Sequence, residues 1–82
     1  MYYVYIVECA DGTLYTGITT DVARRVEEHN TSPKGARYTR NRRPVNLVYQ
    51  EICQDRSRAS KREYEIKKMN KQLKYKLIEN EL

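Results

Sequence analysis

The 82 residues of this chain suffice for one modest hydrophobic core, so we predict a single domain over residues 1–82 and look for no second one. Sixteen Lys and Arg residues against eleven Asp and Glu residues give a formal net charge of +5, which favours a polyanionic partner. No apolar run reaches the roughly 20 residues of a membrane span and no signal-peptide pattern is present, so we expect a cytoplasmic protein that does not contact membranes.

The first two predicted elements are strands that form a hairpin. Residues 2 to 9 are rich in β-branched and aromatic residues on both alternating faces, which predicts a strand covered on both sides. Asp11-Gly12 predicts a turn, and residues 13 to 18 predict the returning strand.

The length of this turn decides how the tyrosines of the hairpin lie. A two-residue loop places Tyr5 and Tyr15 on opposite faces of the hairpin. A three-residue loop, with Gly12 left-handed in a bulge, places both tyrosines on one face and sets Gly17 opposite Tyr5. The sequence leaves both loops open.

A helix follows, capped by Thr20 or Asp21 and ending near His29 or Asn30. Its periodicity predicts a buried apolar arc of Val22, Ala23 and Val26. The charged side chains that point away from this arc are Arg24, Glu27 and Glu28. Arg25 and His29 lie together at the edge of the arc, where each is either functional or an ordinary helix residue, Arg25 then pairing with Asp21.

Residues 31 to 44 predict a loop, broken by proline and glycine and free of acidic residues. Its basic and aromatic side chains are Lys34, Arg37, Tyr38, Arg40, Arg42 and Arg43. So much positive charge in one loop repels itself unless a polyanion lies against it, which predicts contacts with nucleic acid. A solvated surface that keeps the protein soluble is the alternative.

The C-terminal half predicts a strand and two helices. In residues 45 to 52 apolar and polar side chains alternate again, which predicts a third strand. The predicted apolar face of this strand is formed by Val45, Leu47 and Tyr49. Asp55 predicts the cap of a helix that extends to about Met69, with an apolar face of Ala59, Ile66 and Met69. Glu63 falls on that same face, where a carboxylate needs a cation or a metal as its partner, unless it pairs with Lys67 at the surface.

A last helix, capped by Asn70, is expected to cover the core. Its packed side chains are predicted to be Leu73, Leu77 and Ile78. Its outward side chains are predicted to be Lys71, Lys74 and Lys76.

The spacing of these residues resembles the GIY-YIG nuclease superfamily over essentially the whole chain, and most closely its small stand-alone bacterial members. Tyr3-Val4-Tyr5 occupies the place of the first triplet and Tyr15-Thr16-Gly17 that of the second. Arg25, His29 and Glu63 follow at the spacing of the family pattern. Each motif alone is weak, whereas the five together are specific.

The resemblance implies an α+β fold, a three-stranded antiparallel sheet flanked by helices in the order β-β-α-β-α-α, and a metal-dependent endonuclease that hydrolyses phosphodiester bonds in DNA. The catalytic residues that it implies are Tyr5, Tyr15, Arg25, His29 and Glu63. Arg25 is expected to bind the scissile phosphate, and Glu63 to be the one protein ligand of a single Mg²⁺ or Mn²⁺ ion bound mainly with substrate. Tyr5 is the first choice of general base, with Tyr15 and His29 as alternatives.

The expected partner is DNA, branched or damaged DNA included, with RNA and a protein that supplies specificity left open. The residues expected to contact nucleic acid are Gly17, Lys34, Arg37, Tyr38, Arg40, Arg42 and Arg43. Two other functions fit the same residues: a nucleic-acid-binding module with little or no catalysis, and an accessory domain that acts only with a partner.

Overall fold

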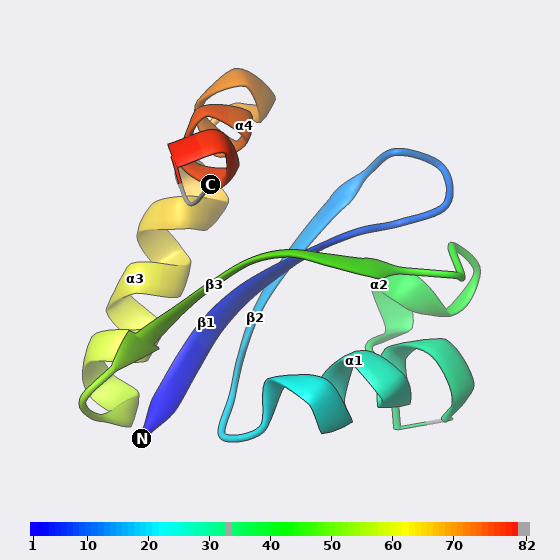
Figure 1. Cartoon of the computed structure of the whole chain (residues 1–82), viewed down its shortest axis with the longest axis horizontal. Helices are drawn as coiled ribbons and strands as arrows, with labels where there is room; N and C mark the ends of the chain where they lie inside the picture. Colours follow the sequence, from blue (N-terminus) through cyan, green and yellow to red (C-terminus); the bar gives the residue numbers. More distant parts are fainter. Residues whose placement is uncertain (33, 81–82) are drawn as a thin grey trace.

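The computed structural model describes residues 1–32 and 34–80, in which seven elements follow one another along the chain (Figure 1). They are β1 (Tyr2–Glu8), β2 (Leu14–Thr19), α1 (Val22–Thr31), α2 (Arg37–Arg40), β3 (Asn46–Cys53), α3 (Arg56–Lys68) and α4 (Lys71–Asn80). The strands form one antiparallel sheet in the order β2-β1-β3. The α+β fold is therefore confirmed, with the short α2 added inside the predicted loop.

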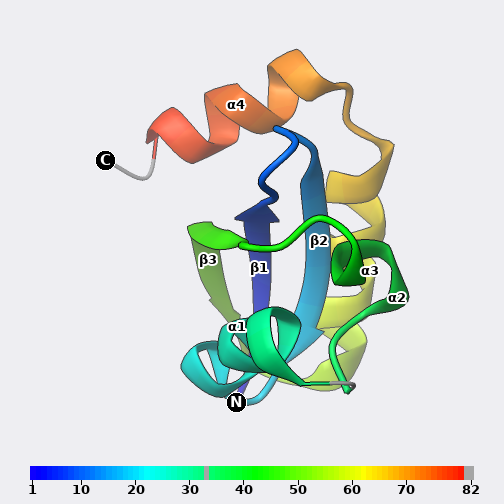
Figure 2. The ribbon, with the colours of Figure 1, turned by 90° about the vertical axis from the view of Figure 1, so that its right-hand side faces the viewer.

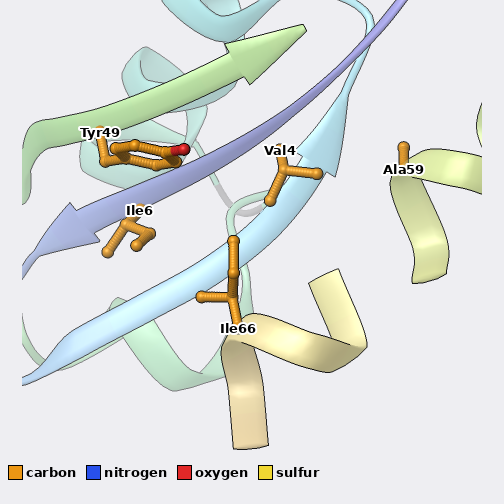
Figure 3. Packing of buried hydrophobic residues seen from close by; sticks show 5 residues of the cluster. All are labelled: Val4, Ile6, Tyr49, Ala59 and Ile66. Atoms are coloured by element: carbon orange, nitrogen blue, oxygen red, sulfur yellow. The ribbon is translucent and has the colours of Figure 1, made fainter. Parts of the chain in front are cut away.

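The central strand β1 is covered on both faces, as predicted from its composition. On one face Val4 and Ile6 pack with Tyr49 of β3 and with Ala59 and Ile66 of α3 (Figure 3). On the opposite face a second cluster packs between the sheet and α1, and its buried members are Tyr5, Val7, Cys9, Val22 and Val45. Figure 1 shows α3 and α1 on opposite sides of the sheet.

The hairpin turn follows the three-residue alternative. The backbone N–H of Cys9 donates to the carbonyl of Thr13 at 2.8 Å, which closes a loop over residues 10–12. Gly12 has a φ of 83°, a left-handed conformation that glycine adopts without strain. This loop sets the register of β1 against β2.

The prediction that Val45, Leu47 and Tyr49 share one face is wrong, because β3 carries a bulge. Ile6 pairs with Tyr49 whereas Val7 pairs with Leu47, so one extra residue of β3 lies between these pairs. The bulge reverses the alternation. Tyr49 therefore packs toward α3, while Val45 packs in the cluster beneath α1.

The first helix is capped by Asp21, whose side chain accepts from the backbone N–H of Arg24 at 3.0 Å. Its buried arc differs from the prediction. Ala23 is exposed, whereas His29 is 0% exposed. The buried line follows Val22, the half-buried Val26 and His29, a spacing of four and then three residues that keeps one helix face toward the sheet. The histidine thus belongs to the core rather than to its edge.

The last two helices have the predicted caps, Asp55 before α3 and Asn70 before α4. Leu77 and Ile78 pack against the core as expected, but Leu73 is 49% exposed, contrary to the prediction. Tyr75 donates its hydroxyl to Glu8 at 2.9 Å, which fixes α4 across the end of the hairpin (Figure 2). Within residues 1–32 and 34–80, no helix has the length and apolar character that crossing a membrane requires.

Candidate active site

The hairpin places Tyr5 and Tyr15 on the same side of the sheet. Tyr5 pairs with Gly17 and Val7 pairs with Tyr15, so both phenols face α1. A Cβ atom at Gly17 would lie 2.6 Å from the phenol oxygen of Tyr5. Glycine at this position therefore makes room for a buried tyrosine, which is 1% exposed.

A chain of buried hydrogen bonds leads from this phenol through α1 to α2. Tyr5 Oη lies 2.7 Å from His29 Nε2, and His29 Nδ1 lies 2.9 Å from Thr39 Oγ1. Thr39 donates its one hydroxyl proton to the carbonyl of Ala36 at 2.9 Å. The backbone N–H of Ala36 also approaches Nδ1, at the longer distance of 3.4 Å. Because the 2.9 Å bond to Thr39 is the shorter one and the Thr39 proton is already donated to Ala36, we assign the imidazole proton to Nδ1, which donates to Thr39, while Nε2 accepts from Tyr5. Thr39 escapes sequence reasoning because it lies in a four-residue helix that shows no periodic pattern.

The environment keeps this imidazole neutral. Burial lowers the pKa of His29 from its ordinary value of 6.5 to about 4, and the positive charges of Arg25 and Arg43 act in the same direction. The Glu28 carboxylate opposes them. The neutral imidazole has a lone pair at Nε2 that accepts a hydrogen bond, and the burial that keeps it neutral also makes its protonated form costly unless negative charge lies beside it.

The phenol of Tyr5 is held in its protonated form. Burial raises the pKa of Tyr5 to about 12, and the neighbouring Tyr15 adds to the rise. Arg25 lowers the pKa and Glu63 raises it, so both of these predicted residues act electrostatically on this phenol. Burial outweighs the stabilisation of the phenolate by the Arg25 guanidinium.

Arg25 is half-buried and held from two directions. Its Nη1 atom forms an ion pair with Glu28 Oε1 at 3.0 Å and donates to the carbonyl of Lys34 at 2.8 Å. The alternative partner Asp21 caps the helix instead. Glu28, predicted to point away, turns toward Arg25, and the three-residue spacing between them is the signal that could have shown it.

Glu63 approaches the site from α3, on the other face of the sheet. Its carboxylate pairs with Lys67 at 3.5 Å, the alternative partner considered from the sequence. Lys67 Nζ in turn lies 6.0 Å from the centre of the Tyr15 ring. The parts of the chain that the structure describes give no ion pair between Glu63 and Arg25.

A single carboxylate is the protein ligand that Glu63 offers to a metal. No group of three or more His, Cys, Asp or Glu side chains suited to a metal occurs in residues 1–32 and 34–80. Mg²⁺ is commonly held by one or two carboxylates together with waters and substrate phosphates. The donor set therefore fits an ion that binds together with a phosphate substrate.

An aromatic stack joins the site to α2. The rings of Tyr15 and Tyr38 stack with their centres 5.8 Å apart and an interplanar angle of 27°. The guanidinium of Arg42 lies 4.2 Å from the centre of the Tyr38 ring and pairs with Asp11 at 3.0 Å. Tyr38 is 40% exposed, so part of it reaches solvent beside the site.

The basic residues of the predicted loop divide into two groups. Arg43 donates to the backbone carbonyls of His29 and Ser32, which makes it part of the scaffold at the end of α1. Lys34, Arg37 and Arg40 are exposed. The side chains of the exposed group therefore reach solvent, whereas that of Arg43 is fixed at the end of α1.

Comparison with known proteins gives consistent matches. Residues 1–76 match the family described as the GIY-YIG catalytic domain. A UPF0213 protein of Desulfotalea psychrophila is 68% identical over 77 residues, covering 94% of this chain and 70% of that protein. A UPF0213 protein of Staphylococcus haemolyticus is 56% identical over 78 residues, covering 95% of this chain and 94% of that protein.

Two solution NMR structures have the same fold. A UPF0213 protein from Bacillus halodurans is 46% identical with a TM-score of 0.61, covering 96% of this chain and 84% of that one. A protein from E. faecalis is 41% identical with a TM-score of 0.65, covering 96% of this chain and 83% of that one. The chain thus resembles small proteins built largely of this domain.

Proposed function

The chain belongs to the GIY-YIG family, and from this premise we propose that it is a metal-dependent endonuclease that hydrolyses phosphodiester bonds in DNA. The observation that carries the proposal is the 2.7 Å hydrogen bond between the buried Tyr5 phenol and the neutral His29 imidazole, beside Arg25. Packing alone has no need of a buried phenol and imidazole, because apolar side chains of similar volume would fill the space without desolvating polar groups.

The attacking water would lose its proton through this pair. A phenol with a pKa of about 12 is a poor base when it must ionise first. We propose instead that Tyr5 Oη takes the proton of the water while its own proton passes to His29 Nε2. The resulting hydroxide attacks phosphorus, the bond to the leaving oxygen breaks, and that oxygen takes a proton from solvent. His29 then releases its extra proton to solvent, which restores the neutral imidazole.

The charged residues would stabilise the phosphate as the reaction proceeds. Arg25, oriented by Glu28, would bind the non-bridging oxygens of the scissile phosphate. Glu63 would hold one Mg²⁺ or Mn²⁺ ion, and Tyr15 would orient the water or the phosphate. When bound, the ion would polarise the phosphate and stabilise charge on the leaving oxygen.

The test is a nicking assay on supercoiled, single-stranded and branched DNA with Mg²⁺, with Mn²⁺ and with a chelator. We expect nicking by the wild type that the chelator stops and that Glu63→Gln loses, while the melting temperature of the variant stays close to that of the wild type. Nicking that continues in the chelator, or in a folded Glu63→Gln variant, contradicts the proposal.

A second candidate function is nucleic-acid binding without hydrolysis, alone or as an accessory to a partner protein. It is favoured by the ion pairs that engage both charged site residues, Arg25 with Glu28 and Glu63 with Lys67. The same assay separates the two functions. Salt-dependent binding of DNA or RNA without product under every metal condition would support the second.

A further inference from the structure

A second basic surface lies on the end of α3 and the start of α4. Residues 67–76 contain no acid and five lysines, which are Lys67, Lys68, Lys71, Lys74 and Lys76. Among the described residues, the only ion pair of these lysines joins Lys67 to Glu63. Lys68 Nζ lies 4.6 Å from the centre of the Tyr64 ring and Lys71 Nζ lies 5.9 Å from the centre of the Tyr75 ring, but these rings are neutral and leave the positive charges to be balanced by solvent ions.

The arginines on the α1 side of the sheet are engaged differently. Arg25 pairs with Glu28, Arg42 pairs with Asp11, and Arg43 donates to two backbone carbonyls. These groups hold the site together. Within residues 1–32 and 34–80, the lysines of the second surface other than Lys67 pair with no carboxylate. Cations whose charge is balanced by counterions are the ones that exchange those counterions for phosphates.

The lysine surface begins at the candidate site. Lys67 Nζ is 6.0 Å from the centre of the Tyr15 ring, and that ring also stacks on Tyr38 of α2. Lys71 and Lys74 then border a hollow of about 160 Å³ together with Thr13 and Leu14. Figure 2 shows α4 crossing the end of the hairpin at this point. A row of cations therefore extends from Tyr15 to the tip of the hairpin.

We propose that Lys71 and Lys74 bind backbone phosphates of the DNA that flanks the cleaved bond, on the side of β2 opposite to α2. This inference rests on the proposed function. The two lysines are three residues apart on one helix, a spacing that sets their Cβ atoms about 5–6 Å apart and lets both contact one strand. Substrate would thus be held from both faces of the sheet, with Tyr15 at the meeting point.

The test measures binding of a short duplex DNA to the full chain by fluorescence anisotropy, in a chelator and over a series of salt concentrations. Lys71→Gln/Lys74→Gln should reduce the slope of log affinity against log salt by about 1 for each lysine. Lys71→Arg/Lys74→Arg should retain the wild-type slope, because the charges remain. The melting temperatures should agree, since neither lysine is buried.

A matched control removes the same charge elsewhere. Arg56→Gln/Lys61→Gln changes two exposed residues in the first half of α3 and should leave the slope near that of the wild type. An unchanged slope in Lys71→Gln/Lys74→Gln, or an equal reduction in the control, overturns the inference.

The binding measurement can be interpreted independently of whether the protein hydrolyses DNA. If the wild type nicks DNA but the Lys71→Gln/Lys74→Gln slope is unchanged, the inference fails and the proposed function stands. If the slope falls but no metal condition yields nicking, the proposed hydrolysis fails while the lysine surface remains a DNA-binding surface.

Discussion

The two faces of the sheet are packed differently, although alternate residues of one strand, β1, supply both. Toward α3, Val4 and Ile6 lie in an apolar layer. Toward α1, Tyr5 donates to His29, and His29 donates to Thr39. Burying polar groups lowers stability unless each finds a partner, and here they do. The comparison shows that the side chains packed toward α3 mainly stabilise the fold, whereas the core toward α1 also contains polar groups suited to chemistry.

The largest expected effect comes from closing the space over the Tyr5 ring. Gly17→Ala adds a Cβ that would lie 2.6 Å from Tyr5 Oη and 2.8 Å from Tyr5 Cζ, so the ring has to move from its place beside His29. We expect nicking to be lost and the free energy of unfolding to fall by about 1–3 kcal/mol. Chemical denaturation and the nicking assay measure the two effects.

The control for this substitution is Gly12→Ala at the hairpin turn. Its positive φ strains an added side chain, but nothing lies within 4 Å of the added Cβ. Gly12→Ala should therefore lose stability and keep nicking. Equal nicking by Gly17→Ala and the wild type would show that the close approach to Tyr5 does not matter.

The pH dependence of stability should report the buried imidazole. The pKa of His29 is about 4 in the folded protein against 6.5 ordinarily, so between these values the unfolded chain binds the proton and the folded one does not. Stability should therefore fall as the pH is lowered from about 6.5 to about 4, by up to about 1.4 kcal/mol per pH unit.

Urea denaturation of the wild type and His29→Gln across this range measures that effect. The variant should show the shallower dependence, because it lacks the titrating group. Parallel curves would mean that the imidazole is no harder to protonate in the folded protein.

The smallest expected effects come from two buried threonines, Thr39 on the α1 side and Thr16 in β2, whose hydroxyl groups differ in hydrogen bonding. Thr39→Val removes the acceptor of the His29 Nδ1 proton and should cost about 1–3 kcal/mol. Thr16→Val should instead stabilise the protein by about 1 kcal/mol, because Thr16 Oγ1 is buried and has no hydrogen-bond partner among the described residues. Denaturation of both variants under one condition checks the opposite signs. Two equal losses would remove the distinction.

Features that depend on neighbouring residues could be predicted from the sequence. The caps Asp21, Asp55 and Asn70 are local signals, and all three helices begin after them. The Asp11-Gly12 pair limits the hairpin turn to a two-residue or a three-residue loop. Gly12 adopts the left-handed conformation that the three-residue loop requires. Helix periodicity singled out Glu63 on the apolar face of α3, where it is half-buried.

Features that depend on distant partners could not be predicted. The bulge in β3 arises from its pairing with β1, so nothing within the strand indicated that Tyr49 would change faces. The depth of His29 follows from how α1 is set against the sheet and α2, not from its helix alone. Thr39 enters the site through the same contact with His29, and the residue spacing in the basic loop gives no sign of that contact.

The most direct test of the central claim, that the phenol facing α1 takes part in hydrolysis, compares Tyr5→Phe with Tyr49→Phe. Tyr49 faces α3 and donates its hydroxyl to Glu51, so Tyr49→Phe also removes one hydrogen-bonded phenol from the same sheet. In a Mg²⁺-dependent nicking assay we expect Tyr5→Phe to lose at least about a hundredfold in rate and Tyr49→Phe to nick like the wild type. Wild-type nicking by a folded Tyr5→Phe variant would contradict the account.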